Sequence, residues 1–99
     1  NLSFVKRFHA PEREILLFTK HETIRYCRDQ RLRLRGFVGR GFAVLPFPRA
    51  SVSSKGLVYE MRDFEMELGQ RESVSNRARN ATVELKVEGE ALVLEEFRL

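Results

Sequence analysis

Apolar and polar residues alternate along the octapeptide Arg40–Phe47, and this period of two predicts a β-strand. Successive side chains of a strand point to opposite faces, so the octapeptide divides into two rows. We assign to the core the compact apolar row of Ala43, Leu45 and Phe47. We expect the other row to be exposed, and it holds Arg40, Phe42 and Val44.

The strand-forming residues Ile24, Tyr26 and Cys27 predict a strand over Thr23–Asp29. Beyond it, three arginines alternate with Leu32 and Leu34, and we expect a basic ribbon there that extends a hairpin beyond the sheet. These arginines are Arg31, Arg33 and Arg35. Proline cannot donate a ladder hydrogen bond, so Pro46 is expected at an edge or a bulge and, with Pro48, at the end of its strand.

Two segments have patterns that fit a helix as well as a strand. The first is Ala10–His21, which has a proline and two glutamates near its start and the apolar run Ile15–Phe18. We favour a helix, although such a run also fits a buried strand. The second is interpreted as a helix over Ser51–Arg62 and then an extended segment over Phe64–Leu68, with a helix over Leu57–Leu68 as the alternative.

The C-terminal residues show strand alternation on both sides of a short polar segment. This pattern predicts a β-hairpin over Ala81–Leu99 that turns at Glu88–Glu90. In the alternative interpretation, Thr82–Val87 is the last strand of the main sheet.

Composition narrows the class of protein. A chain of 99 residues suits one domain, and the lack of an initial Met suggests a domain excised from a longer protein. No apolar run approaches the ~20 residues that span a bilayer, so we expect no membrane association. The single cysteine, Cys27, favours a reducing compartment, so we expect an intracellular location. Residues 1–50 have a net charge of +7 and residues 51–99 of −3, which favours a polyanionic partner.

The octapeptide resembles the RNP1 strand of the RNA recognition motif, with seven of eight positions in agreement and Val44 as the departure. Ser3–Phe8 is loosely similar to the RNP2 strand of that family. The resemblance implies an α+β, ferredoxin-like βαββαβ sandwich: a four-stranded antiparallel sheet with two helices on one face. It would make residues 1–79 the domain and residues 80–99 a hairpin extension packed on it.

The resemblance also implies that the chain binds single-stranded RNA on its sheet face. Bases would stack on Phe4 and Phe42, each for ~1–3 kcal/mol. Val44 replaces an aromatic stacking position and would weaken binding. Phosphates would contact Arg40, Lys6 and the basic ribbon of Arg31, Arg33 and Arg35.

Two rival interpretations stay open, and catalysis is not expected. One rival is a protein-interaction or self-association module that uses the extra hairpin, with a protein partner or a homodimer. The other is an all-β, OB-like barrel. Neither His9 nor His21 has further ligands at zinc spacing, and no phosphate loop follows the glycines, so we expect no enzyme, metal or cofactor.

Overall fold

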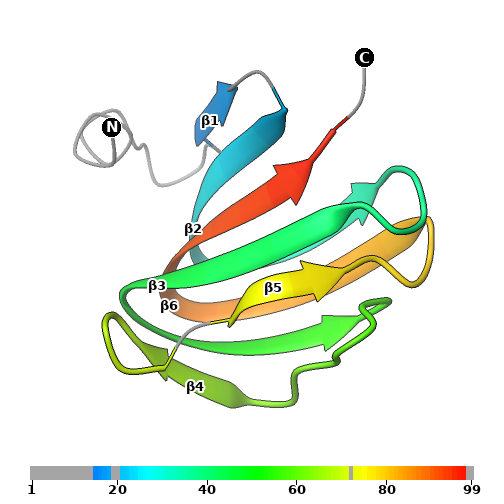
Figure 1. Cartoon of the computed structure of the whole chain (residues 1–99). Coiled ribbons are helices and arrows are strands. Elements are labelled where there is room, and N and C mark those ends of the chain that lie inside the picture. Colours follow the sequence, from blue (N-terminus) through cyan, green and yellow to red (C-terminus); the bar gives the residue numbers. More distant parts are fainter. Residues whose placement is uncertain (1–14, 19–20, 72, 98–99) are drawn as a thin grey trace.

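The computed structural model describes residues 15–18, 21–71 and 73–97. It contains the strands β1 (Ile15–Phe18), β2 (Glu22–Arg35), β3 (Gly41–Lys55), β4 (Phe64–Glu67), β5 (Ser73–Arg77) and β6 (Thr82–Glu96). The strand pairs are antiparallel, and the order across the sheet is β1-β2-β6-β3-β4, with β5 also paired to β3 (Figure 1).

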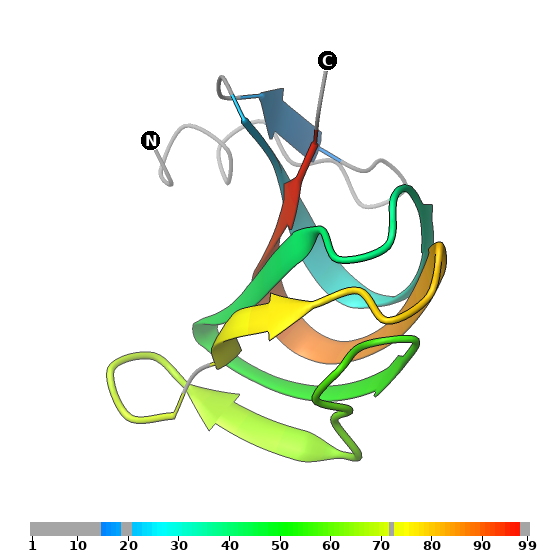
Figure 2. The same cartoon turned by 45° about the vertical axis from the view of Figure 1, so that its right-hand side comes forward.

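The three long strands of this sheet bend where their ladders are interrupted. The register between β2 and β6 shifts at Asp29, and the register between β3 and β6 shifts between Pro46 and Ala50. Gly89 of β6 lies opposite both of these register shifts, and its φ is 94°. Its N–H donates to Asp29 Oδ1 at 2.7 Å. Such bulges curve a sheet, and each long strand therefore contributes to two layers (Figures 1 and 2).

The core lies on the inner face of this curved sheet. Residues from both halves of the long strands meet there, so one cluster joins the two layers. Its most buried members are fully inaccessible to solvent, and they are Cys27, Val52, Leu57, Val83, Ala91 and Val93. A smaller cluster lies on the outer face, where Tyr26 and Leu92 are buried against half-buried neighbours. These neighbours are Ile24, Leu45, Phe47 and Leu94.

The two predicted helices are wrong where the structure describes them. Ile15–Phe18 of the first is strand β1, which pairs with Thr23–Tyr26 of β2, and the rest of its N-terminal part lies outside the described residues. Ser51–Lys55 of the second continues β3, with Val52 in the core between two half-buried serines. Pairing with distant strands overrides the local apolar pattern, which by itself could not separate the two states.

The loop after β3 is organised by Glu60. Its carboxylate accepts hydrogen bonds from the N–H groups of Gly56 (2.8 Å) and Leu57 (3.1 Å) and from Ser54 Oγ (2.7 Å). Burial alone would raise the pKa of Glu60, but these bonds and the nearby Arg79 guanidinium outweigh it and lower the pKa below the usual 4.5. The hydrogen bonds of the loop thus stabilise the ionised form of the Glu60 side chain.

The predicted C-terminal hairpin is also wrong. Residues Thr82–Glu96 form one strand, β6, which lies in the centre of the sheet between β2 and β3. Glycine and two acidic residues are typical of a turn, but here Gly89 forms the bend within a continuous strand. The strand predicted over Thr23–Asp29 is confirmed within β2. An edge or a bulge was expected at Pro46, and the register shifts between Pro46 and Ala50. The expected end of the strand at Pro46 and Pro48 is wrong, because β3 continues to Lys55.

The fold class follows from these corrections. The described residues form strands, turns and bends without a helix, so the α+β ferredoxin-like sandwich is wrong. The strand proposed over Ser3–Phe8 lies outside the described residues. Within the described ranges, the chain has no helix that is long and apolar enough to cross a bilayer.

Replacing Gly89 by alanine should cost more stability than its φ alone explains. A Cβ there would lie 2.5 Å from the carbonyl oxygen of Arg49, so the bend itself must move. We expect Gly89→Ala to lower the free energy of unfolding by about 2–3 kcal/mol, measured by urea denaturation. Gly39→Ala is the control, because φ is 89° there but nothing lies within 4 Å, and it should cost about 1 kcal/mol. Equal losses would contradict this account.

Glu60 should make stability depend on acid pH. A carboxylate with a lowered pKa in the folded state stabilises the fold above its unfolded pKa, and this contribution is lost as the pH falls through the folded value. At pH 7, the unmodified chain should therefore have a higher urea midpoint than the Glu60→Gln variant. The difference between the two midpoints should shrink below pH 4.5. A difference that stays constant from about pH 7 to 3 would exclude this role.

Candidate functional site

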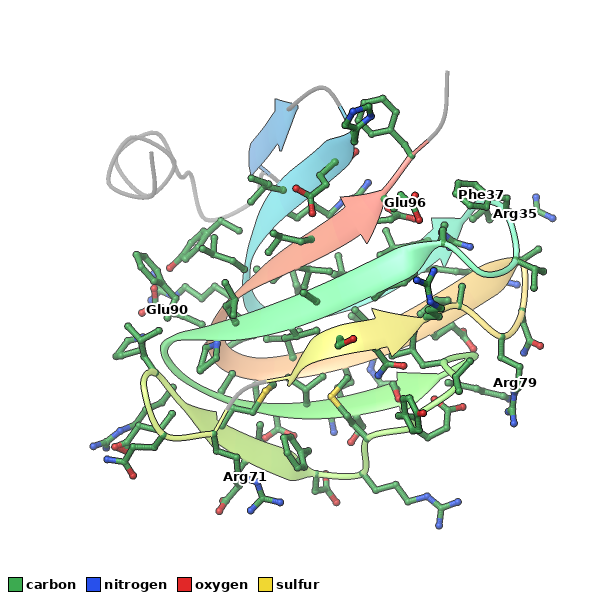
Figure 3. The ribbon with its side chains drawn as sticks, viewed as in Figure 1. Arg35, Phe37, Arg71, Arg79, Glu90 and Glu96 are labelled. Carbon is green, nitrogen blue, oxygen red and sulfur yellow. The ribbon has the colours of Figure 1, made fainter. Side chains whose placement is uncertain are left out.

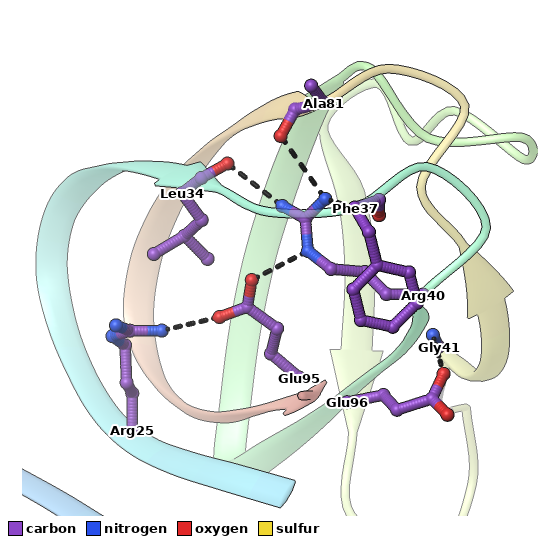
Figure 4. Close-up of polar contacts among 8 residues, drawn as sticks. All are labelled: Arg25, Leu34, Phe37, Arg40, Gly41, Ala81, Glu95 and Glu96. Carbon is purple, nitrogen blue, oxygen red and sulfur yellow. Dashed lines mark hydrogen bonds and ion pairs between the residues drawn. The ribbon is translucent and has the colours of Figure 1, made fainter. Parts of the chain in front are cut away.

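A buried ion-pair network closes one end of the core. Arg40 is 1% exposed, and its Nε donates to Glu95 Oε2 at 2.7 Å. The other oxygen of Glu95 accepts from Arg25 at 3.0 Å. The remaining nitrogens of Arg40 donate to the carbonyl groups of Leu34 (2.9 Å), Phe37 (3.0 Å) and Ala81 (3.2 Å), as Figure 4 shows. The guanidinium thus joins β2 and β6 to the two loops that contain Phe37 and Ala81.

A groove of about 490 Å³ lies beside this network, on the outer side of the sheet. This volume is in the range of small-molecule sites. The groove is lined by residues from the start of β2, the start of β3, the last three positions of β5 and the end of β6. They are His21, Glu22, Gly41, Phe42, Ala43, Ser75, Asn76, Arg77, Leu94 and Glu96.

Two carboxylates give the groove its character. Glu22 and Glu96 are direct partners in the register of β2 with β6, so their side chains lie on the same face. Glu96 is fixed by the N–H of Gly41, which donates to its Oε1 at 2.9 Å (Figures 3 and 4). One carboxylate oxygen of Glu96 is thereby held in place, and the pair is suited to a cation or to N–H donors.

Strand β5 forms the opposite wall and is held from behind. The amide of the buried Asn76 donates to the carbonyl of Tyr59 at 2.8 Å and accepts from its N–H at 3.1 Å. Arg77 donates to the carbonyl of Gly39 at 2.8 Å. These bonds fix the backbone that presents Ser75 to the groove.

A second hollow, of about 620 Å³, lies where β3, β4 and β6 bend. Both of its arginines already have partners: Arg49 pairs with Glu67 at 3.4 Å, and Arg71 lies 4.2 Å from the ring centre of Phe64. The groove beside the buried network is therefore the better candidate. Among the described residues, no group of three or more His, Cys, Asp or Glu side chains is placed to hold a metal ion.

The sequence-predicted site residues are not brought together. Phe4 and Lys6 lie outside the described residues. Phe42 and Val44 are 3% and 1% exposed and belong to the core, so the prediction that they face solvent is wrong. Arg40 is buried with them. The alternation was correct but its faces were inverted, because Ala43, Leu45 and Phe47 form a second apolar row.

The three arginines of the predicted basic ribbon are exposed. Leu32 and Leu34, which alternate with Arg31, Arg33 and Arg35, are buried, which confirms the predicted strand alternation. Figure 3 shows Arg35 at the far end of β2, pointing away from the sheet. These arginines pair with β6 within the sheet and lie away from the groove.

The sequence model of one protein family matches most of the chain. Residues 22–92 match the sequence model of the family described as "Thiamin pyrophosphokinase, vitamin B1 binding domain". The chain belongs to this family. The RNA recognition motif is therefore the wrong family, and single-stranded RNA binding and its rival, the interaction module with a protein partner or homodimer, are not supported.

Solved structures show the same fold in members of this enzyme group. Thiamine pyrophosphokinase from Bacillus subtilis has a TM-score of 0.84 at 15% identity, covering 99% of this chain and 48% of that one. The enzyme from Candida albicans has a TM-score of 0.75 at 17% identity, covering 86% and 33%. The enzyme from Geobacillus thermodenitrificans has a TM-score of 0.76 at 12% identity, covering 98% and 44%.

The chain spans less than half of the length of each of these three proteins. No curated protein matches it by sequence. We expected that the chain is not an enzyme. The family match shows that it is related to a domain of thiamin pyrophosphokinases.

Sequence reasoning missed the groove residues Glu22, Glu96, Ser75 and Arg77. One signal was present, since Glu95 and Glu96 interrupt an apolar strand pattern. A carboxylate at a core position requires a cationic partner, and Arg40 is the partner that the fold supplies. Nothing local connects two residues 55 positions apart.

Removing the Arg40 guanidinium should strongly destabilise the chain. Arg40→Met leaves the Glu95 carboxylate at the end of the core and three carbonyl groups without this donor, so we expect a loss of about 3–5 kcal/mol in urea unfolding. Arg49→Met is the control, because that side chain is 77% exposed, and it should cost less than about 1 kcal/mol. The double variant Arg40→Met, Glu95→Leu should recover part of the loss; no recovery would contradict the ion-pair explanation.

Proposed function

We propose that this chain binds thiamin, and that the groove between β5 and the ends of β2 and β6 is its site. The observation that carries the proposal is the family match over residues 22–92. This range contains Glu22, the first residues of β3 and all of β5.

The chemistry of the groove supports the proposal. Thiamin carries a fixed positive charge on its thiazolium ring, and Glu22 and Glu96 supply negative charge on one face. Its aminopyrimidine has N–H donors that a carboxylate accepts and flat faces that pack on apolar groups. Ala43 and Leu94, which are partners in the β3–β6 register, offer such a half-buried apolar surface.

We further propose that the chain contributes vitamin binding, and that pyrophosphate transfer needs additional protein. Support comes from the lengths of the related enzymes, of which this chain covers 48% at most among the three described above. Under this proposal the chain positions a substrate and is not catalytic by itself. An intracellular location stays a prediction.

Titration calorimetry of the 99-residue chain with thiamin tests the proposal. We expect saturable binding with one site per chain. Glu22→Gln and Glu96→Gln should each weaken binding about tenfold, which corresponds to ~1.4 kcal/mol and to the loss of one charged contact. Glutamine still accepts the hydrogen bond from Gly41, so the fold should persist.

The matched control is Glu84→Gln, which makes the same chemical change at an exposed position of β6 outside the groove. It should leave thiamin affinity unchanged. Absence of saturable binding would reject the function, and equal weakening by Glu84→Gln would reject the site.

A further inference from the structure

A second surface of the sheet concentrates positive charge far from the groove. It is a hollow of about 340 Å³ over β2, β6 and β3, and it shares no residue with the groove. Its lining includes four cations and one carboxylate. These charged residues are Arg31, Arg33, Lys55, Lys86 and Glu84.

The register of the sheet explains how the cations converge. Arg31 lies directly opposite Lys86, and Lys86 lies opposite Ser53. One step along, Arg33 lies opposite Glu84, and Glu84 lies opposite Lys55. Neighbouring strands are ~4.8 Å apart and residues two positions apart are ~6.7 Å apart, so all four cations lie within a small area.

The pair of Arg31 and Lys86 is the unusual feature of this surface. The N–H of Gly36 donates to the carbonyl of Ala81, one pair beyond Arg35–Thr82. Since hydrogen-bonded and non-bonded pairs alternate, Arg31 and Lys86 form a non-bonded pair, whose side chains approach most closely. Like charges placed in this way destabilise a sheet.

Little in the described structure neutralises these cations. Arg31, Arg33 and Lys55 form no ion pair in the part of the chain that the structure describes. Lys86 pairs with Glu88 at 3.4 Å, but both side chains are about half exposed, and such pairs contribute little. A bound anion would relieve the repulsion.

The surroundings limit the size of this anion. Beyond Ser53, the carboxylate of Asp63 accepts from the serine hydroxyl at 3.3 Å. Glu88 follows Lys86 on the same face, and Glu84 lies between Arg33 and Lys55. Asp63 and Glu88 therefore border the cations and Glu84 lies between two of them, and these carboxylates repel a long polyanion and leave room for a compact one.

We propose that the hollow formed by Arg31, Arg33, Lys55 and Lys86 binds a compact oligophosphate anion, of the size of pyrophosphate or tripolyphosphate. Guanidinium groups bind phosphate oxygens through paired hydrogen bonds, and lysines add charge. This site is separate from the thiamin groove and does not depend on the proposed function.

Calorimetry with sodium tripolyphosphate and with orthophosphate at low salt tests the proposal. The chain should bind tripolyphosphate saturably and at least tenfold more tightly than orthophosphate, because only the longer anion reaches several cations. Arg31→Gln should weaken tripolyphosphate binding at least fivefold. Arg62→Gln, an equal charge change at an exposed loop position outside the hollow, should not.

A stability measurement separates a binding site from a merely charged surface. Lys86→Gln should raise the urea midpoint of the free chain, because it removes the like-charge neighbour of Arg31, and it should weaken tripolyphosphate binding. Thiamin affinity should be unchanged in Arg31→Gln, so the two proposals can fail independently.

Three results would overturn the proposal. They are no saturable binding of tripolyphosphate, equal affinity for orthophosphate, and tighter Arg31-dependent binding to phosphatidylserine vesicles or single-stranded RNA than to tripolyphosphate. The last result would mark a surface for extended anions and would exclude a compact site.

Discussion

The structure depends on one guanidinium group buried at the end of the core. Arg40 satisfies Glu95 and three backbone carbonyl groups, and these belong to segments that are distant in the sequence. An ion pair in such a place stabilises little by itself, because desolvation offsets attraction, but breaking it leaves an uncompensated charge. Its contribution is positional: with Glu95 held inward, Glu96 faces outward, where Gly41 fixes it in the groove.

The curved sheet places two different chemistries on its outer surface. At the starts of β2 and β3 and the end of β6, beside β5, carboxylates and apolar groups form the groove. Past the bend, the same three strands carry four cations around one hollow. Because one ladder connects the two regions, the bend at Asp29 and Gly89 separates a surface suited to a cation from one suited to an anion.

Sequence reasoning predicted several strands but neither the sheet nor its site. Local alternation predicted the arginine row of β2, and the missing N–H of Pro46 predicted an edge or a bulge, because both depend on neighbouring residues. It inverted the faces at Phe42, since both rows of that strand are apolar and only the distant Glu95 makes the inner position of Arg40 favourable. For a similar reason, the turn predicted near Gly89 was wrong and the groove was not predicted. Both depend on the central pairing of β6, which is a property of the whole chain.

The central place of β6 also bears on how the chain folds. It is the last of the strands that the structure describes, yet it pairs along its length with both β2 and β3. The two earlier strands can complete their ladders only after most of the 99 residues are available. Contacts so far apart in sequence are slow to form, because the entropy of closing long loops is lost first. During synthesis, β2 and β3 would therefore expose unpaired edges until the C-terminal strand emerges and joins them.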